Sequence, residues 1–135
     1  SLNVMYGFDF TFRGNHSELL VEALGLAPAL ERMLDIPGAM VLGSEPALQL
    51  ALDEDCRIQC RLSFETRTSA YHVRTGEYPE DQLSVYFTAR RCGSLDPGEN
   101  YVGAMQRLAK LCTELVDSYV AENVLKPLQQ AIAIR

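Results

Sequence analysis

Residues 56–65 read Cys-Arg-Ile-Gln-Cys-Arg-Leu-Ser-Phe-Glu, an unbroken alternation of apolar and polar side chains. Because successive side chains of a strand point to opposite faces of its sheet, this period of two predicts a strand with one buried face. The side chains expected to face the core are Cys56, Ile58, Cys60, Leu62 and Phe64. Those expected on the outer face are Arg57, Gln59, Arg61, Ser63 and Glu65. Such a strand is typical of an antiparallel sheet that is covered on one side only.

The same alternation recurs on both sides of this strand. It extends over residues 2–13 and 83–90, and shorter apolar runs occur at 40–42 and 48–52. The polar segment 66–82, with its glycine and proline, is typical of a long hairpin connection. The sequence therefore predicts four or five strands.

Two short helices are expected between the first strand and residue 39. Asn15 is placed to cap a helix in which Glu18 completes a capping box. Gly25 can end that helix, and Pro28 can open a second helical turn.

The longest helix is expected near the end of the sequence. Asp96 is the predicted N-cap, Pro97 the first helical residue and Glu99 the residue that closes a capping box. Apolar residues then recur every three or four positions, as on one face of a helix: Val102, Met105, Leu108, Cys112, Leu115, Val116, Tyr119 and Val120. Pro127 lacks an N–H and clashes with the preceding turn, so a kink or restart is expected over residues 123–126.

These elements predict a single α+β domain over residues 1–135. Its antiparallel sheet would be packed on one face by the long C-terminal helix and an N-terminal helix. A length of 135 residues with 47% hydrophobic content suits one core better than two domains. The residues predicted to form this core are Leu50, Ile58, Leu62, Phe64, Val85, Phe87, Leu108, Cys112 and Leu115.

The charge balance narrows the class of partner. There are 12 Lys and Arg against 18 Asp and Glu, a net charge of −6 that disfavours binding to nucleic acid or to an anionic membrane. Apolar stretches fall short of the roughly 20 residues that a membrane span needs, and no leader pattern opens the sequence. We therefore expect a cytoplasmic protein whose partner is another protein or a small molecule.

No chemistry-bearing motif stands out. Phosphate-loop, dinucleotide, zinc-protease and nucleophile-elbow patterns do not occur in the sequence, so no reaction is predicted. His72 lies among residues of acid/base type, but a solvated loop is the simpler interpretation. Cys92 follows two arginines and is a candidate reactive thiol, although a structural or merely exposed thiol is the simpler interpretation. With no visible secretion signal, the four cysteines are expected to be reduced thiols. Their spacing does not match a zinc site, so we expect no metal and no cofactor.

The outer face of the sheet carries the candidate binding residues. Arg57, Gln59 and Arg61 share this face on one predicted strand, and Tyr86 and Arg90 share it on another. Arginine and tyrosine are enriched at protein interfaces, and here they form a cationic stripe on an acidic protein. The alternative is a solvated face held by cross-strand pairs.

The middle and end of the sequence resemble the small acidic chaperones of type III secretion. The resemblance rests on residues 40–52, on Cys56 to Phe64 and on the helix opening at 96–101, and size and acidity agree with it. It implies a homodimer that binds an extended segment of a secreted protein along its sheet, without catalysis. The sequence departs from that family in its aromatic first strand. It also has no clear helix between the strands that end near Glu65 and begin near Leu83.

Two functions are therefore expected. The first is a non-catalytic protein-binding module, chaperone-like or inhibitor-like, that is homodimeric and uses its sheet face or edge. The second is a small-molecule binder or minor enzyme with a pocket between the sheet and the long helix. The expected lining of that pocket is Tyr6, Phe8, Phe64, Phe87 and Tyr119. A packed core favours the first, and a cavity of a few hundred Å³ with convergent polar groups favours the second.

Overall fold

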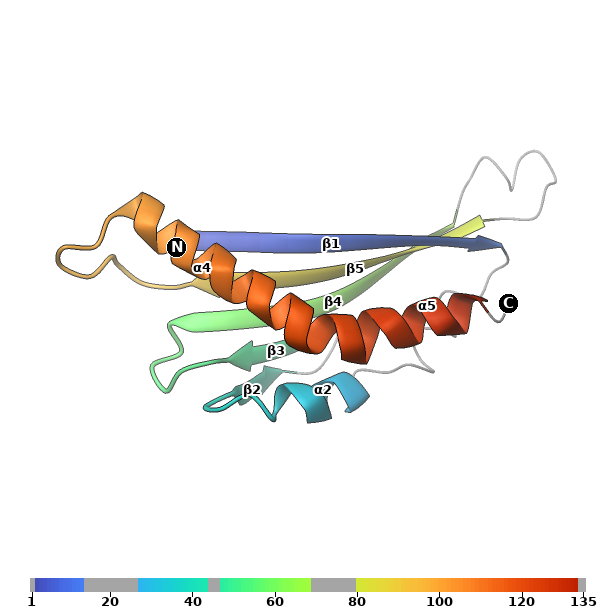
Figure 1. Ribbon diagram of the computed structural model, residues 1–135, viewed down its shortest axis with the longest axis horizontal. Helices are drawn as coiled ribbons and strands as arrows, with labels where there is room; N and C mark the ends of the chain where they lie inside the picture. Colours follow the sequence, from blue (N-terminus) through green and yellow to red (C-terminus); the bar gives the residue numbers. More distant parts are fainter. Residues whose placement is uncertain (1, 14–26, 44–46, 69–79, 134–135) are drawn as a thin grey trace.

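A computed structural model describes residues 2–13, 27–43, 47–68 and 80–133. In chain order the elements are β1 (Leu2–Arg13), α2 (Ala27–Met33), β2 (Met40–Gly43), β3 (Ala47–Ala51), β4 (Ile58–Thr68), β5 (Glu80–Arg91), α4 (Tyr101–Leu115), the π-helix η1 (Val116–Leu125) and α5 (Lys126–Ala133). The five strands form one antiparallel sheet in the order β1-β5-β4-β3-β2 (Figure 1). The predicted α+β class, with its antiparallel sheet and long C-terminal helix, is confirmed.

The sheet register places alternate residues on two different faces. Leu62 of β4 lies opposite Phe87 of β5 and opposite Leu48 of β3, so these side chains share one face. One residue earlier on β4, Arg61 lies opposite Thr88 and is on the other face. From Ile58 onward, the period of two in the sequence therefore predicted the two faces of β4 correctly.

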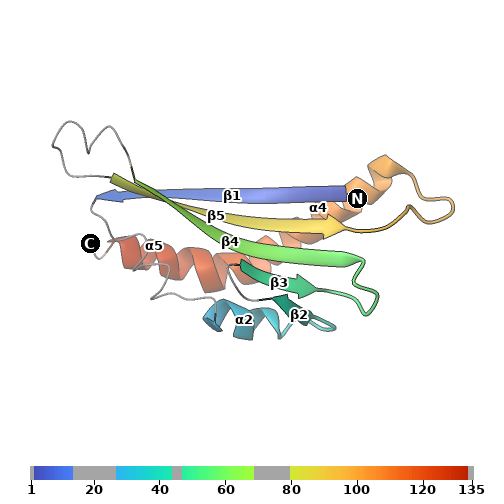
Figure 2. The same ribbon diagram turned by 180° about the vertical axis from the view of Figure 1, so that it is seen from behind.

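The helices cover only one of these faces. The run α4–η1–α5 lies across it, and α2 packs against η1 beside the β2 edge (Figure 1). From behind, the strands lie in front of the helices and their second face is uncovered (Figure 2). We call this second surface the open face. No described helix is both long and apolar enough to cross a membrane.

The core lies between the sheet and the long helix. Seven of the nine predicted core residues are buried, namely Leu50, Leu62, Val85, Phe87, Leu108, Cys112 and Leu115. Ile58 and Phe64 are only partly buried, although Phe64 still packs against the core. Of the two helices predicted after the first strand, α2 matches the one opened by Pro28. The helix expected from Asn15 lies outside the described residues.

The long helix begins later than predicted. Residues 96–99 form a β-turn in which the amide of Glu99 donates to the carbonyl of Asp96 at 3.0 Å. Gly98 has a φ of +79°, the left-handed conformation that a type II turn needs after proline and that a helix cannot contain. The N-cap is instead Asn100, whose side chain accepts a hydrogen bond from the amide of Gly103 at 2.7 Å.

Pro127 lies in the first turn of α5 and does not end the helical run. The chain remains helical from Tyr101 to Ala133, and the ten residues of η1 directly precede the last α-helical segment. The amide of Lys126 donates to the carbonyl of Ala121, five residues earlier, as in a π-helix. A wider turn of this kind is one way for a helix to change direction near a proline. The predicted restart over residues 123–126 therefore takes the form of a change in hydrogen-bond pattern.

Candidate functional site

Four of the five predicted binding residues lie together on the open face. Gln59 of β4 is directly opposite Arg90 of β5. Arg61 lies two residues after Gln59 on β4, and Tyr86 lies four residues before Arg90 on β5. The guanidinium of Arg90 donates to Oε1 of Gln59 through Nη2 at 2.9 Å and through Nε at 3.3 Å. This pair fixes the direction in which the Arg90 side chain lies.

A hollow of about 230 Å³ opens on this face. Its lining comes from all five strands: Asn3, Leu42, Gln49, Gln59, Cys60, Arg61, Thr88 and Arg90. The two charged members, Arg61 and Arg90, are both exposed cations, and three of the others are amides. We call this site the arginine hollow. Its combination of guanidinium and amide donors suits a carboxylate.

Tyr86 lies outside the lining of the arginine hollow, two residues from Thr88 along β5. It lies opposite Ser63 and opposite Gly7, where a Cβ atom would be only 3.4 Å from the tyrosine ring. The ring therefore lies over the backbone of Gly7, an arrangement in which an aromatic side chain covers a glycine on the neighbouring strand. Two residues before Tyr86 on β5, Ser84 lies opposite Asp9 of β1, and its hydroxyl donates a hydrogen bond to Oδ1 of Asp9 at 2.5 Å.

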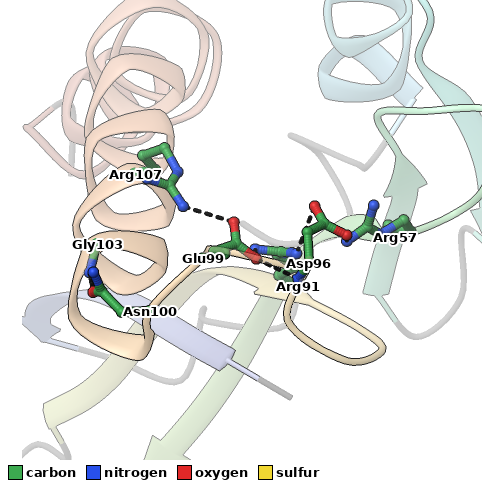
Figure 3. Close-up of polar contacts among 7 residues, drawn as sticks. All are labelled: Arg57, Arg91, Asp96, Glu99, Asn100, Gly103 and Arg107. Carbon is green, nitrogen blue, oxygen red and sulfur yellow. Dashed lines mark hydrogen bonds and ion pairs between the residues drawn. The ribbon is translucent and has the colours of Figure 1, made fainter.

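Arg57 is separated from the other four. Its guanidinium contacts Asp96 at 3.0 Å, at the end of the sheet where β5 leads into α4 (Figure 3). Asp96 also contacts Arg91 at 3.4 Å, and Arg91 contacts Glu99 at 2.6 Å. Arg107 of α4 completes the series with a 2.6 Å contact to Glu99. We call these five alternating charges the ion-pair chain.

Arg57 departs from the predicted face because the regular strand starts after it. Cys56 has a φ of +54°, an unusual conformation for a residue with a side chain, and β4 begins only at Ile58. The carbonyl of Arg57 still accepts a hydrogen bond from the amide of Cys92 at 2.7 Å. Its side chain no longer follows the alternation that places Gln59 and Arg61 on the open face.

Glu99 is the electrostatic centre of the ion-pair chain. Its carboxylate accepts a hydrogen bond from the backbone amide of Asp96 and contacts the guanidinium groups of Arg91 and Arg107. The amide of Asp96 contributes most, followed by Arg91, and together with Arg107 they lower the pKa of Glu99 to about 2. Glu99 therefore stays ionised throughout the physiological range. It ties the start of the long helix to β5.

A second hollow, of about 280 Å³, lies beside the ion-pair chain and between the sheet and α4. Its lining is Asp53, Arg57, Ile58, Arg91, Asp96, Glu99, Ala104, Arg107, Leu108 and Leu111. In position and size it matches the pocket of the alternative function, but its lining does not. Phe87 is fully buried, and the hydroxyl of Tyr6 lies 2.6 Å from that of Thr113 on α4.

The thiols behave as packing groups. Burial, with a smaller contribution from Cys112, raises the pKa of Cys60 to about 12, and burial also raises the pKa of Cys112. Neither is a thiolate near neutral pH. Cys92 is half-buried at the end of β5, and the loop that contains His72 lies outside the described residues. Within the described residues, no cluster of three or more His, Cys, Asp or Glu could hold a metal ion.

Sequence reasoning missed two parts of these sites. It gave Asp96 and Glu99 only a capping role, although three arginines bind them. It also missed Asn3, Leu42 and Gln49 in the arginine hollow, because their strands were not placed next to one another. The sequence matches no known protein-family model and no curated protein, so the geometry carries the functional interpretation.

Proposed function

We propose that this protein is a non-catalytic protein-binding module, chaperone-like or inhibitor-like, whose open face binds an extended acidic segment of a partner protein. The observation that carries the proposal is the arginine hollow, where Arg61 and Arg90 line one concave site on an uncovered sheet. The proposal includes the cytoplasmic location expected from the sequence. The resemblance to type III secretion chaperones makes secreted proteins the first partners to test.

Charge favours an acidic partner. The molecule has a net charge of −6, yet the charged side chains in the lining of the arginine hollow are both positive. Within the described residues, Arg61 and Arg90 take part in none of the ion pairs, in contrast to Arg57, Arg91 and Arg107. A carboxylate placed between Arg61 and Arg90 gains charge-assisted hydrogen bonds, which are about twice as strong as neutral ones.

Shape favours an extended segment. The arginine hollow is large enough for a side chain and small for a folded domain, and it opens beside β2. Met40, Val41 and Leu42 of β2 are 41%, 43% and 45% exposed, so apolar surface adjoins the cationic surface. An extended peptide places alternate side chains on one side, which lets a carboxylate enter the hollow while an apolar neighbour contacts β2.

The hollow beside the ion-pair chain is the observation that favours the alternative, a small-molecule binder or minor enzyme. It combines an apolar wall, including Leu108 and Leu111, with converging charged groups. Those groups already contact one another, so a charged ligand would have to replace existing ion pairs. This cost makes the open face the better site.

The test is a peptide titration followed by fluorescence anisotropy. The probe is a labelled peptide of about ten residues that alternates Glu and Thr, and its control alternates Gln and Thr. We expect the acidic peptide alone to bind. The double substitution Arg61→Ala and Arg90→Ala should weaken binding by about 1–3 kcal/mol for each arginine removed.

Arg107→Ala is the matched control, because Arg107 is an exposed arginine away from the open face. It should leave the affinity unchanged. Equal binding of the two peptides, or loss of binding with Arg107→Ala alone, would refute the proposed site. If the protein instead binds small carboxylic acids, and Arg107→Ala weakens that binding, the small-molecule binder is the better interpretation.

A further inference from the structure

The two edges of the sheet differ in length and regularity. At one edge, β1 pairs with β5 in a single register over all twelve residues, from Leu2 with Arg91 to Arg13 with Glu80. At the other edge, β2 has four residues, and its pairing is interrupted by a bulge between Val41 and Gly43. Among the described residues, no strand pairs with the outer side of β1.

Proteins usually protect exposed edges with proline, lysine, bulges or short strands. The β2 edge has two of these features, since it is short and bulged. The β1 edge has none of them: residues 2–13 contain no proline and no lysine, and their pairing with β5 is unbroken. Unpaired backbone groups along a strand of this length are suited to pair with another strand.

We propose that β1 is the interface of a homodimer, in which the β1 strands of two copies pair antiparallel about a two-fold axis perpendicular to the sheet. The two sheets then form one ten-stranded sheet with both helical layers on one side. This proposal does not depend on the function of the arginine hollow. It identifies the surface through which the homodimer expected from the sequence would form.

Charge favours a second copy over another partner. The protein as a whole has a net charge of −6, so most of its surface would repel a second copy. The β1 segment contains one acid, Asp9, and one base, Arg13, and is neutral. Antiparallel pairing also places same-face residues opposite each other, so the aromatic and aliphatic residues on the helix side meet their own kind.

The start of α4 adds a second contact. Figure 1 shows its first turn projecting past the outer edge of β1, near the N-terminal end of that strand. Tyr101 and Val102, in this turn, are 60% and 63% exposed. In an antiparallel pair, the first turn of each copy lies above the far half of the partner strand, which gives these side chains an apolar surface to contact.

The expected affinity is moderate. Twelve residues at about 3.4 Å each make an edge about 40 Å long, and a strip about 10 Å wide buries about 400 Å² of each copy. Even with the contribution of Tyr101 and Val102, this is less than the roughly 800 Å² per partner of a standard interface. A dissociation constant in the micromolar range is therefore expected.

The test is multi-angle light scattering between about 5 and 500 μM protein, a range that spans this affinity. We expect the mass to rise from 15.0 kDa toward twice that value with concentration. Met5→Lys places a cation on β1 at a methionine that is 63% exposed, and it should raise the dissociation constant about tenfold or more. Met40→Lys is the matched control on β2 and should leave it unchanged.

A mass of 15.0 kDa at every concentration would overturn the proposal, as would a dimer that Met40→Lys dissociates and Met5→Lys does not. At about 5 μM protein, where dimerisation contributes least to stability, both variants should keep the wild-type melting temperature, which shows that they fold. The peptide titration of the wild type at about 5 μM protein, the low end of the scattering range, separates the two proposals. Met5→Lys is not used there, because Met5 lies opposite Thr88 of the arginine hollow and a lysine would add a cation beside it. Peptide binding under these conditions shows that the arginine hollow binds peptide without the dimer. If no dimer forms at any concentration, the dimer proposal is wrong, and the peptide titration still tests the proposed function.

Discussion

Phe87 and Tyr86 are neighbours on β5, yet they belong to two different surfaces. Phe87 is fully buried under the long helix, while Tyr86 lies on the open face beside Gly7. The contrast extends across the sheet, since one face is apolar and packed and the other has arginines, amides and a hollow. The same strands therefore supply stability on one side and a surface for recognition on the other. Substitutions at adjacent positions should separate these two roles.

The largest difference is expected for Phe87→Ala against Tyr86→Ala. Removing a buried aromatic ring leaves a cavity and costs about 3–5 kcal/mol in free energy of unfolding. Tyr86→Ala removes a partly exposed cross-strand contact, with an expected cost of about 0.2–1 kcal/mol. Urea unfolding of both variants measures the difference, and equal losses would show that the two faces do not differ in packing.

The ion-pair chain provides the next largest effect. The Arg91 side chain is only 12% exposed and contacts both Asp96 and Glu99. Arg91→Ala leaves these carboxylates with fewer partners and should cost about 1.5–3 kcal/mol, the range for hydrogen bonds to charged groups. Arg90→Ala, one residue earlier on the open face, is the control. If Arg90→Ala destabilises the protein as much, the two arginines do not have the separate roles assigned to them.

Glu99 should make this end of the molecule sensitive to acid. Its pKa in the folded protein is about 2, below the value of 4.5 for a free side chain, so the unfolded chain binds the proton more tightly. The stabilisation is complete above pH 4.5 and is lost as the pH falls toward 2. Urea unfolding of the wild type and Glu99→Gln should differ most near pH 6 and converge below pH 4.5. A difference that does not change with pH would show that the charge of Glu99 is not responsible.

The faces of the sheet were predictable from the sequence because alternation is a local property. Each strand carries its own pattern, so Leu62, Phe87 and Arg61 could be placed on their faces without knowing which strands are neighbours. Arg57 could not be placed in this way, because the backbone at Cys56 is left-handed and the regular strand begins only at Ile58. The alternation of side chains between the two faces therefore does not include Arg57. The start of α4 was missed for a related reason, since the turn at Gly98 outweighs the capping signal of Asp96.

The arginine hollow was predictable only in part. Gln59, Arg61 and Arg90 share a face by alternation, but Asn3 and Leu42 join them only through the strand order β1-β5-β4-β3-β2. That order depends on contacts between distant parts of the chain, which no local pattern contains. The polar segment between β4 and β5 correctly indicated that these two strands pair as a hairpin. No local sequence pattern indicated that β1 would pair with β5.

The smallest expected difference separates Arg57 from Arg61, which the sequence placed on one face. Arg57 pairs with Asp96, but its side chain is 38% exposed and that of Asp96 is 56% exposed, so water weakens the attraction. Arg57→Ala should therefore cost about 0.2–1 kcal/mol in stability and leave binding of the acidic peptide intact. Arg61→Ala should change stability by no more than about 0.5 kcal/mol, as surface substitutions usually do, while it weakens peptide binding. Paired urea and peptide titrations of the two variants give the comparison. If Arg57→Ala weakened the peptide and Arg61→Ala did not, the binding surface would lie at the end of the sheet, beside the ion-pair chain.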